Sequence, residues 1–186
     1  MSTEHNHIFP AKRAKSLQSW FRRLLQNPRK ILHDHVRKGS VLLDVGCGPG
    51  FFTLEAARLV GPSGKVIAAD LQEEMLGMVE LAAHESGLQE RILLHKCEPD
   101  RIGVKEAVDL VLAFYVVHEL PDQEAFFREM KSILEPGGSV FLVEPGFVVS
   151  KQAFQETLDL AKTAGFSNAG RPGVLLSRTA VLKFPD

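Results

Sequence analysis

Short apolar runs alternate with helical patterns along most of the chain from residue 40 onwards. The runs are rich in strand-forming residues and too short for helices: Val41–Val45, Lys65–Asp70, Arg91–Cys97, Val108–Val116 and Ser139–Glu144. Between them, apolar residues recur at helical spacing over four segments: Phe51–Val60, Gln72–Ser86, Gln123–Leu134 and Lys151–Ala164. Strands and helices that alternate in this way are typical of βαβ units. The pattern therefore predicts an α/β fold whose parallel sheet is covered by helices on both faces.

The C-terminal end of the chain departs from this alternation. No helical pattern returns after Gly165, and two further strand-like segments, Phe166–Leu176 and Arg178–Phe184, follow one another without a helix between them. Parallel neighbours need a crossover connection, whereas antiparallel neighbours can be joined by a short turn. The two segments are therefore predicted to form an antiparallel pair at one end of the sheet.

The first 39 residues form a basic region that is predicted to be helical. Apolar residues recur at helical spacing over residues 10–25, and Asn27-Pro28 predicts the cap and first turn of a second short helix that reaches Val36. Nine basic residues against Glu4 and Asp34 give this region a net charge of +7, whereas the rest of the chain sums to −8. The nine are Lys12, Arg13, Lys15, Arg22, Arg23, Arg29, Lys30, Arg37 and Lys38. Such a segment can guide anions, RNA or a membrane surface toward a protein, or it can be a solvated helix face, and both interpretations stay open.

Length and composition narrow the class of protein. The 186 residues fit one domain, and 45% apolar with 24% charged residues is ordinary for a globular chain with a full core. No apolar run approaches the length of a membrane-spanning helix, and no apolar signal segment follows the first Met. Cys47 and Cys97 are too few for a disulfide framework or a structural zinc site, so no metal is expected. We expect a single domain in the reducing cytoplasm.

A glycine-rich turn follows the first predicted strand, and an acid follows the second. The segment Asp44-Val45-Gly46-Cys47-Gly48-Pro49-Gly50 has the spacing Gly-x-Gly-x-Gly, which differs from the dinucleotide pattern Gly-x-Gly-x-x-Gly. A pyrophosphate needs free amides at the helix N-terminus, and Pro49 removes one. Asp70 ends the neighbouring strand, where its carboxylate can accept hydrogen bonds from the two hydroxyls of a ribose. Together these features favour a ligand with a ribose and an amino-acid tail, without phosphate.

Four segments in order resemble class I S-adenosylmethionine-dependent methyltransferases: Val41–Gly50, Val66–Asp70, Asp109–Phe114 and Leu134–Gly138. The resemblance covers about residues 28–184 and is greatest to the small methyltransferases of the ubiquinone/menaquinone-biosynthesis type. It implies a Rossmann-like sheet of seven strands in the order 3-2-1-4-5-7-6, with the last strand antiparallel. It also implies S-adenosylmethionine as cofactor and S-adenosylhomocysteine as product.

The resemblance implies a cofactor site, residue by residue. The residues that would hold the methionine part lie in the glycine turn and at the end of the fourth strand: Asp44, Gly46, Cys47, Gly48, Gly50, Ala113 and Phe114. Those that would hold the ribose and adenine lie at or after the ends of the second and third strands: Asp70, Leu71, Met75, Cys97 and Glu98. One position departs from the family, because many relatives carry an acid where this chain has Lys96.

Candidate catalytic residues follow the fourth and fifth strands, where open α/β sheets bind ligands: Tyr115, His118, Glu119 and Glu144. Histidine titrates near neutral pH, so His118 is the first candidate for a general base, and Glu144 is the second. His118 can instead be a pocket-wall residue. The family motif Asn/Asp-Pro-Pro-Tyr/Phe for methylation of exocyclic base amines is missing, since Phe114-Tyr115-Val116-Val117 stands there. This disfavours a nucleic acid as partner.

Two functions of different classes follow. The first is a methyltransferase that acts on a small-molecule acceptor by direct methyl displacement, as a monomer or homodimer. The second is a non-catalytic S-adenosylmethionine-binding module that acts through protein partners. A nicotinamide oxidoreductase is disfavoured by the glycine spacing. Residues 1–37 are expected to form a helical lid over a core of residues 38–186, and Trp20 and Phe21 on the lid favour an apolar or aromatic acceptor.

Overall fold

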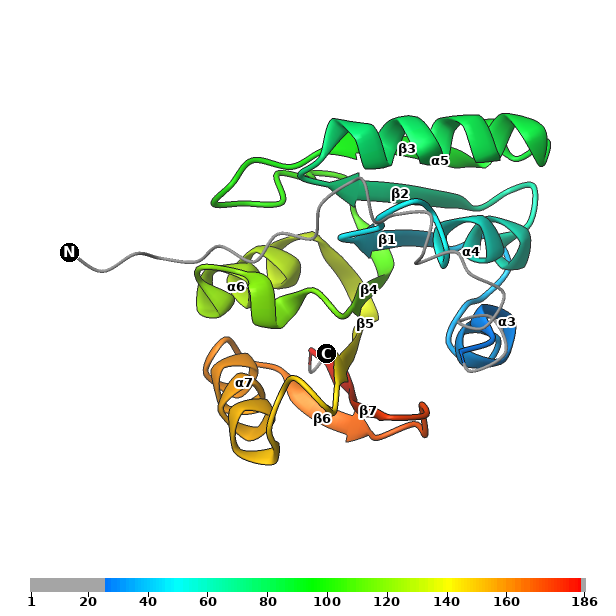
Figure 1. Cartoon of the computed structure of the whole chain (residues 1–186). Helices are drawn as coiled ribbons and strands as arrows, with labels where there is room; N and C mark the ends of the chain where they lie inside the picture. Colours follow the sequence, from blue (N-terminus) through cyan, green and yellow to red (C-terminus); the bar gives the residue numbers. More distant parts are fainter. Residues whose placement is uncertain (1–25, 185–186) are drawn as a thin grey trace.

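The computed structural model describes residues 26–184, which form one seven-stranded sheet in the order β3-β2-β1-β4-β5-β7-β6 (Figure 1). The strands are β1 (Val41–Val45), β2 (Lys65–Asp70), β3 (Ile92–Lys96), β4 (Val108–Phe114), β5 (Leu134–Pro145), β6 (Ser167–Gly170) and β7 (Ser177–Lys183). Neighbouring strands pair in parallel except for β7, which is antiparallel to both β5 and β6. The predicted strand order and the antiparallel last strand are confirmed.

Helices cover both faces of the sheet. The α-helices are α3 (Pro28–Leu32), α4 (Thr53–Val60), α5 (Glu73–Glu85), α6 (Gln123–Ile133) and α7 (Lys151–Thr163), and the short 3-10 helices are η2 (Gln89–Arg91) and η3 (Val117–Glu119). Helix α4 contacts both α3 and α5 on one face, and α6 packs beside α7 on the other. Asn27 caps α3 as predicted, because its side chain accepts a hydrogen bond from the Lys30 amide at 3.2 Å.

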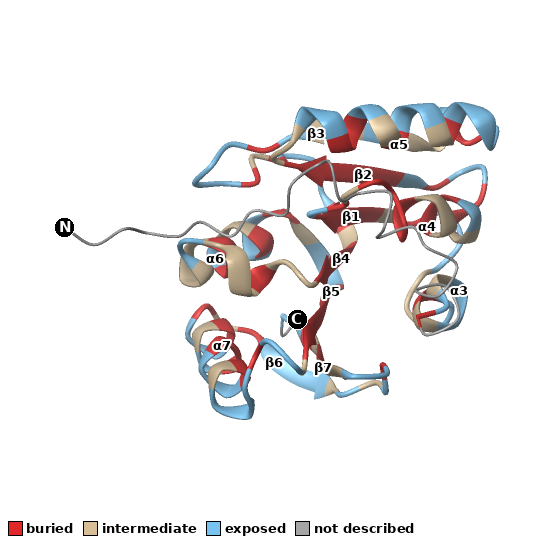
Figure 2. Cartoon of the chain, viewed as in Figure 1, coloured by how far each residue is buried: buried red, intermediate tan, exposed pale blue. Residues whose placement is uncertain are grey.

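The core lies on both sides of the central strands, which Figure 2 shows as buried along almost their whole length. Successive residues of a strand point to opposite faces, so Leu43 and Val45 pack with α6 and α7, while Leu42 packs with α3 and α4. This arrangement explains the near-continuous apolar runs in the sequence, since both faces of each strand are covered. It also places the carboxyl ends of the parallel strands along one edge of the sheet.

Two predicted boundaries were wrong. The predicted strand Phe166–Leu176 is a strand only over Ser167–Gly170, because Pro172 lacks a backbone donor and Leu176 takes a left-handed conformation with φ of 57°. The helix predicted to run to Leu134 ends at Ile133, and β5 starts at the next residue, since Leu134 already pairs with Val108 of β4. Tertiary pairing therefore overrides the local helical pattern at that position.

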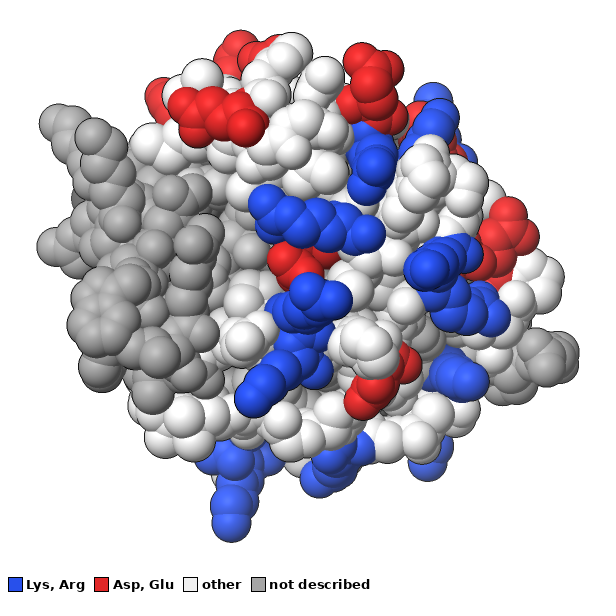
Figure 3. Space-filling view, turned by 90° about the vertical axis from the view of Figure 1, so that its right-hand side faces the viewer, with Lys and Arg blue, Asp and Glu red and all other residues white. Residues whose placement is uncertain are grey.

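The face on the side of α3 and α4 carries Lys and Arg side chains interspersed with acidic ones (Figure 3). Arg37 pairs with Asp109 at 3.5 Å, and Arg58 pairs with Glu55 at 3.2 Å. Ion pairs of this kind are ordinary for a solvated surface. Within residues 26–184, no helix is long and apolar enough to cross a membrane.

Candidate active site

A cavity of about 600 Å³ opens where β1, β2 and β4 end. Its size lies within the range of small-molecule sites, and its position is the one at which open α/β sheets bind ligands. The sequence-predicted residues that line it are Asp44, Gly46, Cys47, Gly48, Asp70, Leu71, Met75, Cys97, Glu98, Phe114, Tyr115, His118 and Glu119. Gly50, Ala113 and Glu144, which were also predicted site residues, are not among the lining residues and lie buried beside it.

The glycine turn after β1 needs glycine for two different reasons. A side chain at Gly46 would place its Cβ 2.7 Å from Cγ2 of Val116, so the turn packs closely against the end of the fourth strand. A Cβ at Gly48 would meet no atom within 4 Å, and the φ of Gly48 is +52°. Gly48 therefore leaves a hollow in the cavity wall, into which a ligand can press against the backbone.

The amides of the glycine turn are already bonded within the protein. The Cys47 amide donates to the Ala69 carbonyl at 3.1 Å, and the Gly48 amide donates to Asp70 Oδ2 at 2.9 Å. The Gly50 amide donates to the Cys47 carbonyl at 3.1 Å, and Pro49 has no amide hydrogen. A phosphate site needs several unbonded amides that converge on the anion. The turn lacks them, which agrees with the non-phosphate ligand that the glycine spacing predicts.

Two buried carboxylates, Asp44 and Asp70, face this end of the cavity. Asp44 Oδ2 accepts a hydrogen bond from the Thr53 hydroxyl at 2.6 Å. Burial raises the pKa of Asp44 to about 7, although the Thr53 hydrogen bond lowers it and the Asp70 charge raises it. Burial also raises the pKa of Asp70, against amide hydrogen bonds that include those from Gln72 and Gly48. Two such groups, on adjacent strands, favour a ligand that carries positive charge.

Both cysteines line the same end of the cavity. Burial raises the pKa of the Cys47 thiol well above its usual value and that of the Cys97 thiol to about 12, and nearby carboxylates raise both further. A thiol must ionise to act as a nucleophile, so these side chains are neutral parts of the cavity wall. Among residues 26–184, no group of three or more His, Cys, Asp or Glu side chains is placed to hold a metal ion.

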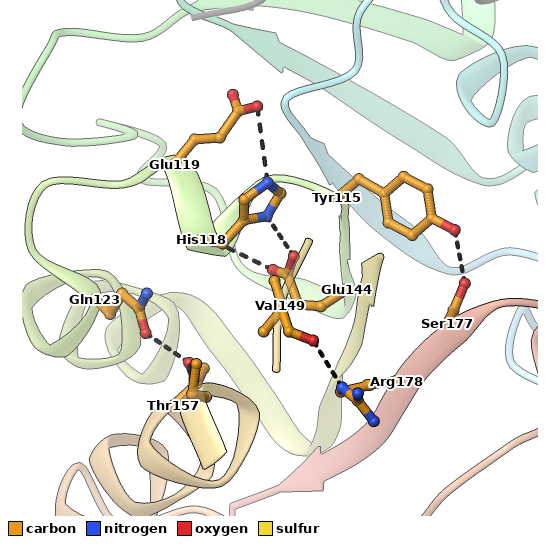
Figure 4. Close-up of polar contacts among 10 residues, drawn as sticks. Tyr115, His118, Glu119, Gln123, Glu144, Val149, Thr157, Ser177 and Arg178 are labelled. Atoms are coloured by element: carbon orange, nitrogen blue, oxygen red, sulfur yellow. Dashed lines mark hydrogen bonds and ion pairs between the residues drawn. The ribbon is translucent and has the colours of Figure 1, made fainter. Parts of the chain in front are cut away.

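His118 lines the opposite part of the cavity and is held from behind by Glu144 (Figure 4). Nδ1 of the imidazole bonds to Oε2 of Glu144, and the His118 backbone amide donates to Oε1 of the same carboxylate at 3.3 Å. Nε2 lies 3.9 Å from Oε1 of Glu119. The hydrogen bond to Glu144 raises the pKa of His118, against the effect of burial. The imidazole is therefore fixed, and Nε2 is the nitrogen left for a ligand.

Tyr115 follows β4 in a left-handed conformation with φ of 62°, which is rare for a residue of this size. Its hydroxyl accepts a hydrogen bond from the Gln26 side chain and lies 2.6 Å from Ser177 Oγ (Figure 4). Ser177 Oγ donates to the Leu175 carbonyl at 3.1 Å, so the Tyr115 hydroxyl is the donor toward Ser177. Strained backbone of this kind is concentrated at functional sites.

Four exposed apolar side chains stand at the edge of the cavity on two loops, and we call them the apolar rim: Phe147, Val148, Leu175 and Leu176. The sequence prediction missed them, together with Gln26 and Thr53. Phe147 and Val148 directly follow β5 and could have been found as apolar residues just beyond a strand. Leu175 and Leu176 were assigned to a strand, and nothing in the sequence indicated that they reach the cavity.

The fold and the site together define the chain as a class I S-adenosylmethionine-dependent methyltransferase, with the sheet order, glycine turn and second-strand acid of that class. The model of the methyltransferase domain family matches residues 36–168, and the chain belongs to that family. S-adenosylmethionine is accordingly the cofactor of this site. The predicted lid residues 10–25, with Trp20 and Phe21, lie outside the described residues.

Similar proteins include demethylmenaquinone methyltransferases. The chain is 30% identical over 132 residues to that of Anoxybacillus flavithermus, which is 71% of this chain and 56% of the relative. It is 32% identical over 131 residues to those of Staphylococcus aureus, which is 68% of this chain and 53% of the relative. The chain thus spans about half the length of the curated relatives it matches.

Solved structures share the fold. A crystal structure of an S-adenosylmethionine-dependent methyltransferase from Aquifex aeolicus matches with a TM-score of 0.85 and 25% identity, over 94% of this chain and 98% of that one. TrmN from Thermus thermophilus matches with a TM-score of 0.64 and 28% identity, over 84% of this chain and 48% of that one. The first likeness extends over almost the whole length of both chains.

Proposed function

We propose that this protein transfers the methyl group of S-adenosylmethionine to a hydroxyl of a small-molecule acceptor, with His118 as general base. The observation that carries the proposal is the imidazole of His118. It lines the same cavity as the glycine turn, and a buried carboxylate fixes its orientation. A non-catalytic binding module would need the cofactor end of the cavity and would have no use for such a pair.

The residues at the cofactor end fit the charge and shape of S-adenosylmethionine. Asp70 is proposed to accept hydrogen bonds from the ribose hydroxyls, and its two oxygens keep lone pairs beyond the amide bonds they already accept. Asp44 and the hollow at Gly48 are proposed to receive the methionine part, whose ammonium group suits a buried carboxylate. The bound cofactor supplies a methyl group activated by its sulfonium.

The remaining predicted residues complete that site in the proposal. Leu71 and Met75 would lie against the ribose or adenine, and Cys97 and Glu98 line the cavity where the adenine edge is expected. Phe114 would lie beside the methionine part. Ala113 and Gly50 do not line the cavity, so their role is to pack the strand and the turn behind it.

His118 and Glu144 have different tasks in this proposal. Nδ1 donates its proton to the Glu144 carboxylate, which leaves the Nε2 lone pair free to accept a proton from the acceptor hydroxyl. Glu144 is 1% exposed and does not line the cavity, so it is a positioning residue and not a base. Because the pKa of His118 is raised, the base is stronger than an ordinary histidine and needs a higher pH to be unprotonated.

The acceptor end of the cavity favours an apolar or aromatic compound. The rings of Phe52, Phe114 and Tyr115 pack in series, with centroids 4.1 Å and 4.5 Å apart, and all three line the cavity. Concave sites with such walls bind apolar ligands and orient them through a few polar groups, here His118 and Glu119. The relatives named demethylmenaquinone methyltransferases support a small-molecule acceptor rather than a nucleic acid.

Release of S-adenosylhomocysteine tests the proposed function. The purified protein is incubated with S-adenosylmethionine and a panel of phenols, quinols, thiols and carboxylic acids, with a reaction lacking acceptor as control. Turnover with a hydroxyl acceptor is expected. Tight binding of S-adenosylmethionine by calorimetry without turnover on any acceptor would instead support the binding module.

The predicted lid can be tested in the full chain, since Trp20 is its only tryptophan. Gln26 lines the cavity, so the chain that precedes it starts from the cavity wall. If residues 10–25 cover the site, S-adenosylhomocysteine should change the fluorescence emission of Trp20. Emission that is identical with and without saturating ligand would argue against the lid.

A further inference from the structure

The apolar rim exposes an unusual amount of large apolar side chain to water. Phe147, Val148, Leu175 and Leu176 are between 55% and 76% exposed, and all four surround one opening. They lie on two loops, one between β5 and α7 and the other between β6 and β7. Figure 2 shows the loop between β6 and β7 as largely exposed. Single exposed apolar residues are ordinary, but a cluster at the mouth of a cavity indicates an interaction surface.

The protein holds both loops in place. The Gly146 amide donates to the Leu176 carbonyl at 2.8 Å, which links the two loops directly. Arg178 reaches across from β7, and its Nε donates to the Val149 carbonyl at 2.8 Å. Leu176 itself takes the left-handed conformation, which is unfavourable for a leucine. The apolar rim is therefore a preformed surface whose exposure is maintained by specific bonds.

Cations flank the apolar rim. The two segments that carry it, residues 145–151 and 171–178, contain Lys151, Arg171 and Arg178 and no Asp or Glu. Lys151 and Arg171 are exposed, whereas Arg178 is partly buried against the loop it supports. An apolar protrusion with cations at its margin has the chemistry of a surface that lies on anionic lipid.

We propose that the apolar rim docks on an anionic lipid surface and turns the mouth of the cavity toward it. The apolar side chains would enter the boundary between head groups and acyl chains, while Lys151 and Arg171 would contact the lipid phosphates. Such docking lies in the plane of the surface and needs no spanning helix. It gives an acceptor that partitions into lipid a direct path into the cavity.

Two other occupants of the apolar rim are disfavoured by charge. A second copy of this chain, docked symmetrically through the same rim, would bring Lys151 and Arg171 of the two copies close together. The chain's own first 25 residues contain five basic residues against Glu4 and would face the same cations. Like charges repel in both cases, whereas an anionic lipid surface attracts them.

Co-sedimentation with lipid vesicles tests the proposal in the full chain. The vesicles are of phosphatidylcholine alone or of equal parts phosphatidylcholine and phosphatidylglycerol. Phe147→Ser and Leu176→Ser remove rim side chains, and Leu81→Ser is the matched control, because Leu81 is 62% exposed on α5 and does not line the cavity. Lys151→Glu tests the charge without altering the rim, and thermal unfolding verifies that each variant is folded.

The wild-type protein and Leu81→Ser are expected to bind the mixed vesicles more tightly than the neutral ones. Each rim variant should bind about tenfold more weakly, as expected for the loss of a buried large apolar side chain. Lys151→Glu should weaken binding to the mixed vesicles at least fivefold or so, since it removes one positive charge and adds a negative one. Failure of the wild-type protein to bind either vesicle would overturn the proposal. So would a rim variant that binds like Leu81→Ser, or a wild-type dimer that Phe147→Ser converts to monomer without any lipid binding.

Discussion

At the cofactor end of the cavity, two buried carboxylates lie at the ends of adjacent parallel strands and are held by short-range hydrogen bonds. At the acceptor end, His118 and Tyr115 lie on the segment after β4 and are held by residues from distant parts of the chain. Asp44 and Asp70 bond to neighbours in the turn and helix that follow them. Tyr115 bonds instead to Gln26 and Ser177, 89 and 62 residues away.

The difference explains why one end resembles its family and the other does not name its substrate. Local bonds between a strand and the turn after it require particular residues at fixed spacing, so they leave a motif in the sequence. Long-range bonds at the acceptor end depend on the whole sheet, and the loops that shape the opening can vary around them. Experiments that separate cofactor binding from turnover test this division.

The largest expected effect is that of His118→Ala on turnover. If the acceptor loses a proton, the variant should be slower by about 10²–10⁴-fold, the usual contribution of a general base. Affinity for S-adenosylmethionine should stay nearly unchanged, because His118 lies at the acceptor end. Initial rates of S-adenosylhomocysteine release and calorimetry measure the two quantities. A variant with normal turnover on the true acceptor would make His118 part of the cavity wall.

Glu144→Gln separates positioning from base chemistry in the same experiment. The hydrogen bond to Glu144 is the main cause of the raised pKa of His118, so its loss should lower that pKa. For the wild-type protein, the rate should rise with pH through a midpoint above that of an ordinary histidine. In the variant this midpoint should move to lower pH while the maximal rate falls. An unchanged pH profile would contradict the role given to Glu144.

Asp70→Ala should give the next largest effect, this time on cofactor affinity. The change removes the proposed ribose hydrogen bonds and the bond to the Gly48 amide, so affinity should fall by about tenfold to a few hundredfold. Asp100→Ala is a matched control, since Asp100 is an exposed acid that does not line the cavity. Calorimetry that gives wild-type affinity for Asp70→Ala would remove Asp70 from the cofactor site.

Cofactor affinity should also depend on pH through Asp44. Its pKa of about 7 means that half of the free protein carries a proton there at neutral pH, and a cationic ligand favours the charged form. Binding should therefore release a proton, and affinity should fall by up to about tenfold per pH unit below 7 and level off above it. Asp44→Asn should lose this dependence and serves as control for titration of the ligand. Equal pH profiles for the two proteins would contradict the assignment.

Tyr115→Phe should have the smallest effect and should fall on stability. The variant loses the hydrogen bonds of the hydroxyl to Gln26 and Ser177, each worth about 0.5–1.5 kcal/mol of unfolding free energy. Denaturant unfolding measures the change, with Ser177→Ala as a companion that removes one of the two bonds. If Tyr115→Phe unfolds at the wild-type denaturant concentration, long-range bonds do not stabilise the acceptor end.

The sequence predicted the fold well because both periodicity and the family motif indicated the same sheet. Short apolar runs between helical patterns specified the parallel strands, and the missing last helix specified the antiparallel pair. The cavity-lining position of Asp44 and Asp70 followed from the same strand ends. Their roles toward the cofactor remain predictions.

The apolar rim could not be predicted from the sequence. Phe147 and Leu176 come from loops almost thirty residues apart, and only the antiparallel pairing of β5 with β7 brings those loops together. The position of Glu144 behind His118 likewise depends on how β5 and η3 meet in three dimensions. Pattern and motif describe strands and turns, whereas these contacts arise from tertiary packing.

The buried site of Glu144 within β5 has a consequence for redesign and for evolution. The carboxylate that orients the histidine belongs to the rigid sheet, and the residues that border the opening belong to the loops that follow it. Loops can accept insertions and exchanges that a central strand cannot. We therefore expect that grafting new sequences between β5 and α7 would redirect the enzyme to other acceptors while the inherited proton-transfer machinery stays intact.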